Sequence, residues 1–84
     1  MSAYANPRQR AVLARAGWDQ ASLTGRTWID PETGVETSTS IALRRILKRA
    51  RFDYCETLDS AAFQLAQAAA EALGLDPVIP CEAA

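Results

Sequence analysis

Residues 26–54 read RTWIDPETGVETSTSIALRRILKRARFDY and hold the strongest structural signals of the chain. Asp30 opens a turn, the following proline presets φ, and Gly34 accepts the positive φ that closes it. The residues on both sides of the turn are rich in β-branched and aromatic side chains, which favour strands. We therefore predict a short β-hairpin with Trp28 and Val35 on its buried side. A two-stranded hairpin is not stable alone, so it must pack on helices.

A basic helix is predicted to follow over residues 40–54, with the hydroxyl side chains of residues 37–40 as N-caps. At 100° per residue, one arc of this helix is apolar and is expected to face the core. The core arc comprises Leu43, Ile46, Leu47, Ala50 and Tyr54. The opposite arc carries five cations, Arg44, Arg45, Lys48, Arg49 and Arg51. Ile41 and Phe52 lie in the middle of this basic arc, where a solvated face needs no large apolar side chain.

Helices are also predicted before and after this stretch. The first begins at Asn6-Pro7, an N-cap followed by a proline without an amide hydrogen to lose, and stops near Gly17. Residues 18–25 are expected to contain a further helical turn, with a loop at Thr24-Gly25. The third helix begins near Thr57 or Asp59 and ends at a glycine cap, Gly74. Its predicted apolar stripe is Leu58, Ala62, Leu65, Ala69, Ala72 and Leu73.

The expected fold is a single, mostly helical α+β domain in the order α-β-β-α-α. Residues 1–6 are predicted to be a flexible N-terminus, residues 7–75 the globular domain, and residues 76–84 a loose C-terminal tail. No apolar run approaches the length of a membrane span, and the first ten residues lack the apolar segment of a signal peptide. We therefore expect a cytoplasmic protein that does not bind membranes.

The order of these features resembles the W family of head-completion proteins of lambda-type phages. The matching pieces are Thr24-Gly25-Arg26, the hairpin over residues 27–37, and Thr39-Ser40 before Arg44-Arg45. The likeness covers residues 8–52, with a shorter hairpin and an additional acidic helix. It implies a structural, phage-type accessory protein as one alternative function.

Catalysis is not predicted, because the chain contains no histidine and so excludes Ser–His and Cys–His arrangements. Asp30, Glu32 and Glu36 are interpreted as turn and strand-surface residues. No phosphate-binding loop or GxGxxG motif is present, so we expect no cofactor and no small-molecule substrate. Cys55 and Cys81 are interpreted as two free thiols, although a disulfide is conceivable, and they lack the further ligands of a metal site.

The charges divide the chain into two halves. Residues 1–52 carry nine basic and four acidic side chains, a net charge of +5, whereas residues 53–84 carry six acidic side chains and none that is basic. Three interpretations of the basic arc follow. It is a solvated face, a nucleic-acid-binding face that contacts phosphates, or a protein interface in which arginines surround apolar anchors. The pI of 5.2 argues against nucleic acid.

We favour the protein interface. The hypothesis is a small adaptor, regulator or inhibitor that binds an acidic partner surface or a second copy of itself. The predicted partner-binding residues are Ile41, Arg44, Arg45, Lys48, Arg49, Arg51 and Phe52. A competing structural account places the acidic third helix on the basic arc, which would make Ile41 and Phe52 an internal seam.

Overall fold

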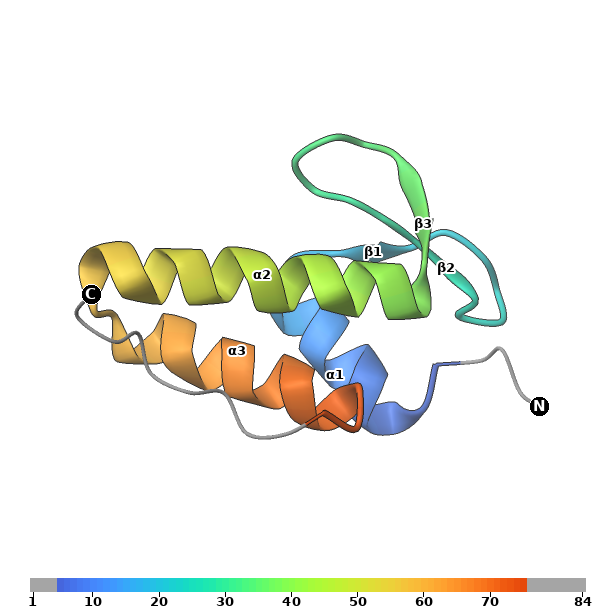
Figure 1. Ribbon diagram of the computed structural model, residues 1–84. Helices are drawn as coiled ribbons and strands as arrows, with labels where there is room; N and C mark the ends of the chain where they lie inside the picture. Colours follow the sequence, from blue (N-terminus) through green and yellow to red (C-terminus); the bar gives the residue numbers. More distant parts are fainter. Residues whose placement is uncertain (1–4, 76–84) are drawn as a thin grey trace.

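The computed structural model describes residues 5–75, which form three helices and a three-stranded antiparallel sheet (Figure 1). The elements are α1 (Pro7–Arg15), β1 (Asp19–Gln20), β2 (Thr27–Ile29), β3 (Glu36–Ser38), α2 (Thr39–Thr57) and α3 (Ser60–Ala72). The α+β class and the order of helix, strands and two helices are confirmed. In the part of the chain that the structure describes, no helix has the length and apolar character needed to span a membrane.

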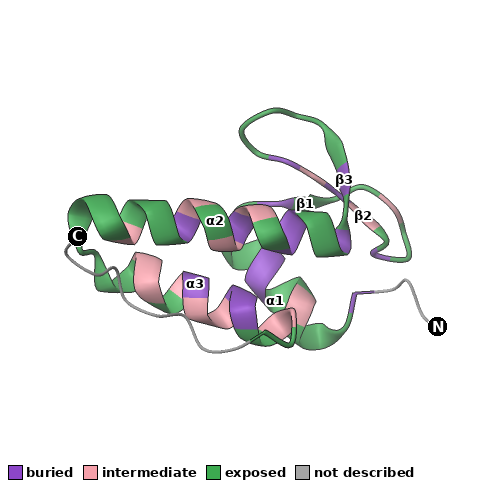
Figure 2. Ribbon diagram, viewed as in Figure 1, coloured by how far each residue is buried: buried purple, intermediate pink, exposed green. Residues whose placement is uncertain are grey.

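The helices α2 and α3 form an antiparallel hairpin, and α1 packs across the half of it that holds the N-terminus of α2 (Figure 1). The sheet lies against the same half of α2. Most of the core therefore gathers where α1, the sheet and the helical hairpin meet. The buried cluster consists of Ala5, Val12, Leu13, Trp18, Trp28, Ala42, Leu43, Ile46 and Ala69. The far end of the helical hairpin carries mostly exposed residues (Figure 2).

The ends of α1 follow the predicted capping chemistry. Asn6 Oδ1 accepts a hydrogen bond from the Gln9 amide at 2.8 Å, and the Asn6 amide donates to Gln9 Oε1 at 2.9 Å. At the other end Gly17 takes a φ of +87°, and the Trp18 amide donates to the Leu13 carbonyl. This turn folds Trp18 back into the core. Ala5, which precedes α1, is buried.

The hairpin has the predicted turn and a different buried pair. Trp28 lies opposite Thr37, and both are buried. The Trp28 indole Nε1 donates to the Gly25 carbonyl at 3.2 Å and to Thr39 Oγ1 at 3.1 Å, which ties the sheet to the start of α2. The expectation that Val35 is buried is wrong: it precedes β3 and is 54% exposed. The strand β1, which pairs with β2, was not predicted and lies where a further helical turn was expected.

The predicted core face of α2 is confirmed at Leu43, Ile46 and Ala50, whereas Leu47 and Tyr54 are only half-buried. The helix extends to Thr57, three residues beyond its predicted end. In α3 the buried residues are Ala66, Ala69 and Ala70. The predicted stripe of α3 is therefore partly wrong, and Leu58 is not on it. Leu58 is the left-handed C-cap of α2, with a φ of +56°, and is 71% exposed.

Cys55, near the end of α2, is disulfide-bonded. No cysteine among the described residues has a free thiol. The interpretation of Cys55 as a free thiol is therefore wrong. That interpretation rests on the general rule that thiols in the cytoplasm stay reduced. The rule does not say whether a particular cysteine has a partner within bonding distance. Cys81 and the predicted tail lie outside the described residues.

Candidate functional site

A buried carboxylate organises the side of α2 that faces the hairpin loop. Asp30 is 0% exposed, and its two oxygens accept hydrogen bonds from Arg49 at 3.0 and 2.8 Å and from Arg45 at 3.1 Å. The Glu32 amide donates to Asp30 Oδ1 at 2.8 Å, closing the predicted turn. Arg49 Nε also lies 2.8 Å from a carboxylate oxygen of Glu32. The interpretation of Asp30 as a turn-surface residue is therefore wrong.

These contacts explain how a carboxylate can stay charged inside the protein. The hydrogen bonds from Arg49, more than any other factor, hold the pKa of Asp30 well below its usual range, although burial acts in the opposite direction. In return, the hydrogen bond to Asp30 raises the pKa of Arg49. Two of the seven predicted partner-binding residues, Arg45 and Arg49, thus fasten the hairpin loop to α2.

The outer face of α2 carries the remaining cations around one exposed aromatic ring. Phe52 is 64% exposed. It lines a shallow depression of about 980 Å³ together with all five cations of the basic arc, Arg44, Arg45, Lys48, Arg49 and Arg51. Among the described residues, Arg44, Lys48 and Arg51 make no ion pair. The structure therefore brings six of the predicted residues together, and we call Phe52 with Arg44, Lys48 and Arg51 the Phe52 patch.

Ile41 is exposed but does not belong to this patch. Its side chain is 49% exposed and does not line the depression around Phe52. Phe52 is eleven positions after Ile41, which is about 16 Å along a helix axis. The account in which α3 covers the basic arc is wrong, because both apolar side chains are exposed. In the structure α3 packs against the other side of α2, where Phe63 contacts Tyr54 at a ring-centroid distance of 5.0 Å.

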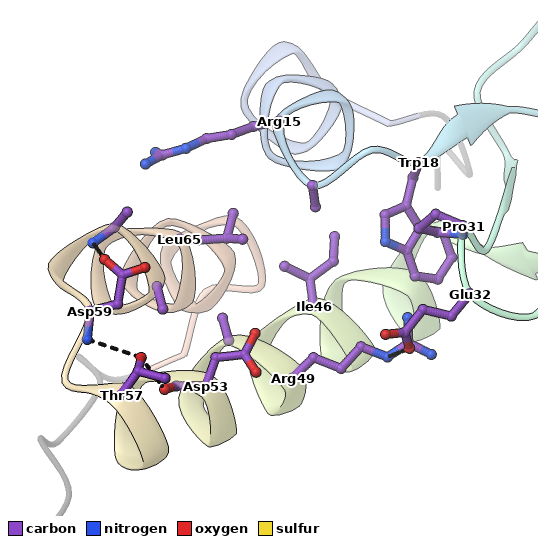
Figure 3. A pocket seen from close by; sticks show the side chains of 14 residues that line it. Arg15, Trp18, Pro31, Glu32, Ile46, Arg49, Asp53, Thr57, Asp59 and Leu65 are labelled. Atoms are coloured by element: carbon purple, nitrogen blue, oxygen red, sulfur yellow. Dashed lines mark hydrogen bonds and ion pairs between the residues drawn. The ribbon is translucent and has the colours of Figure 1, made fainter.

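A second hollow, of about 540 Å³, opens between the end of α1, the hairpin loop and the α2–α3 pair (Figure 3). Ile46 and Leu65 contribute to its apolar lining, and Trp18 stands at one wall with the Arg49 guanidinium 5.9 Å from its ring centroid. Its charged lining includes Arg15 and Asp53. Sequence reasoning missed this hollow, since its lining residues come from four separate segments. Part of the lining could have been predicted, because Trp18 directly follows the glycine that ends α1 and a large apolar residue there commonly folds back onto the helix.

Comparisons with protein-family models, with curated proteins and with solved structures find no match to the chain. The likeness to phage head-completion proteins therefore stays a prediction based on the order of sequence features. The function proposed below is based on the geometry of the Phe52 patch and on the ion pairs that Asp30 and Glu32 form with Arg45 and Arg49.

Proposed function

We propose that the chain is a small, non-catalytic protein-binding module that docks an acidic protein surface on the Phe52 patch. The observation that supports this most directly is the exposed phenyl ring of Phe52 within a group of cations. Burying a side chain of this size on binding contributes about 1.5–3 kcal/mol. Aromatic anchors surrounded by arginine are typical of the residues that dominate binding energy at protein interfaces.

The division of the cations also supports a protein partner. Arg45 and Arg49 neutralise Asp30 and Glu32 within the fold. Arg44, Lys48 and Arg51 form no ion pair with any of residues 5–75 and are the cations proposed to meet an external acidic group. Three cations around a ring fit a small acidic patch with an apolar centre. A face built for phosphates gains affinity from many cations and becomes strongly salt-dependent. The formal net charge of −1 disfavours such non-specific binding to nucleic acid.

The proposal is tested by affinity capture on immobilised parent protein, on Phe52→Ala and on the control Leu23→Ala. Leu23 is a fully exposed apolar residue in the β1–β2 connection and does not line the depression around Phe52. The input is a nuclease-treated native lysate to which a differently tagged copy of the chain is added. We expect the parent and Leu23→Ala to retain the same protein, and Phe52→Ala to lose it through a weakening of about 1–2 kcal/mol or more.

Two further measurements make the result decisive. Phe52→Ala must unfold cooperatively near the melting temperature of the parent, because its exposed ring is not part of the core. Arg44→Glu should slow association more at low salt than at high salt, since charge steering is screened. Equal retention by all three proteins would contradict the proposal. Material that the parent captures from an untreated lysate but not from the nuclease-treated one would instead assign the face to nucleic acid.

A further inference from the structure

We infer that the partner of the Phe52 patch is a second copy of the chain, bound through an antiparallel contact between the two α2 helices with Phe52 at the two-fold axis. This inference rests on the proposed function and names the occupant of that face. It is carried by the charges on either side of Phe52. Lys48 lies one turn before the ring and Glu56 one turn after it, and all three side chains are exposed.

The spacing of these residues makes the face complementary to itself. Residues four apart lie on the same side of a helix, so Lys48, Phe52 and Glu56 form one row. A two-fold axis through Phe52 exchanges the two ends of this row. Lys48 of each copy then faces Glu56 of the other, and the two phenyl rings meet at the centre. Such a reciprocal arrangement is the property that a symmetric, isologous interface requires.

Known helix packing provides a geometry for this contact. When the rows of residues four apart on two helices interdigitate, the helices cross at about −50° and the rows run side by side. In the antiparallel case each Lys48–Phe52–Glu56 row aligns with its symmetry copy in reverse order. Two helices that cross at this angle diverge quickly, so the contact is local. Ile41, about 16 Å from Phe52 along the axis, is then outside it.

Within residues 5–75, the row of Lys48, Phe52 and Glu56 is exposed. The described residues from Cys55 to Ala61, at the far end of the helical hairpin, are all exposed, so none of them buries the row (Figure 2). Neither Lys48 nor Glu56 forms an ion pair within residues 5–75. An interface of standard size would take about 800 Å² from each copy, roughly one seventh of the accessible surface of 5562 Å². A local crossing buries less, so we expect a weak dimer that forms at micromolar or higher concentrations.

The experiment measures sedimentation equilibrium of the full chain from micromolar to several hundred micromolar concentration. The parent should form dimers, and Phe52→Ala should raise the dimer dissociation constant by at least about tenfold. Lys48→Glu and Glu56→Lys should each weaken self-association, because like charges then face each other. An equimolar mixture of these two variants should recover a heterodimer, in which both Lys48–Glu56 positions again pair opposite charges.

A matched pair of variants separates this register from general attraction between oppositely charged proteins. Arg8→Glu and Glu71→Lys change the net charge by the same amounts at exposed positions on α1 and α3. Alone or mixed, they should associate like the parent. Dimerisation that is unchanged in Phe52→Ala, Lys48→Glu and Glu56→Lys would overturn the inference. Equal effects of the Arg8 and Glu71 variants on dimerisation would overturn it too. So would a parent that stays monomeric throughout; Phe52-dependent capture of a different protein would then leave the proposed function standing.

Discussion

At the scale of single residues, the buried carboxylate of Asp30 predicts how the protein responds to acid. Hydrogen bonds from Arg49 keep the pKa of Asp30 well below its usual range, whereas an unfolded aspartate has a pKa of about 3.9. As the pH falls below that value, the unfolded chain gains a proton that the folded chain does not. The free energy of unfolding contributed by Asp30 is therefore complete well above pH 4 and declines as the pH falls toward the lowered native pKa.

Replacing Asp30 with asparagine should remove this dependence. We expect Asp30→Asn to lose about 2–4 kcal/mol at pH 7, because two arginines lose their buried partner while remaining partly solvated. The difference from the parent should shrink on acidification. Urea unfolding at several pH values between 7 and 2.5 measures it, with Glu36→Gln on the exposed strand surface as a control. A constant difference between parent and Asp30→Asn at all pH values would contradict the assignment.

The role of Asp30 could not be predicted from local pattern. The turn it opens was predictable, because proline and glycine at fixed offsets define the backbone. Its partners lie 15 and 19 positions later, on a helix whose periodicity does not show which cations face a neighbouring loop. For the same reason, the basic arc of α2 was identified as a whole, whereas the division between fold-holding and unpaired cations required the three-dimensional structure.

At the scale of elements, the turn between α2 and α3 contains a strained position. Leu58 has a φ of +56°, a conformation that costs a non-glycine residue about 1–2 kcal/mol. Its exposed side chain contributes little packing. Leu58→Gly should therefore raise the free energy of unfolding by about 0.5–1 kcal/mol after the extra flexibility of unfolded glycine is subtracted. Chemical denaturation measures this, and Leu58→Ala, which keeps the strain, should change little. Destabilisation by glycine would show that the Leu58 side chain matters.

Helices and strands were predicted correctly where local residues, such as capping side chains, determine the backbone, and were missed where the local sequence pattern is weak. The capping residues Asn6 and Asp59 mark helix starts where predicted, and both accept the expected amide hydrogen bonds. The two-residue strand β1 was missed because Asp19-Gln20 shows no alternation of apolar and polar side chains. The face of α3 was predicted in part: Leu65, Ala69, Ala72 and Leu73 belong to or pack against the core. The buried Ala66 and Ala70 were left out of the predicted stripe because alanine occurs all around that helix, so periodicity barely distinguishes one stripe from another.

At the scale of the whole molecule, the boundary between the basic and the acidic half of the sequence falls within α2. The basic half of the sequence ends at Phe52, and the acidic half begins at the next residue. The helix continues through this boundary to Thr57 without interruption. The exposed ring therefore stands at the point where the surface of one helix changes sign. The sequence showed this boundary, and the structure adds that the ring at the boundary is exposed.

The disulfide at Cys55 should contribute to the stability of the whole fold. A disulfide limits the conformations of the unfolded chain and typically contributes about 2–4 kcal/mol to stability. We expect the oxidised protein to show no thiol that reacts with Ellman's reagent. Its free energy of unfolding should exceed that of Cys55→Ser by this amount, and the difference should vanish when both proteins are measured with reductant. The reduced comparison controls for the change of side chain. Reactive thiols in the native protein, together with equal stability of parent and variant without reductant, would show that Cys55 is free.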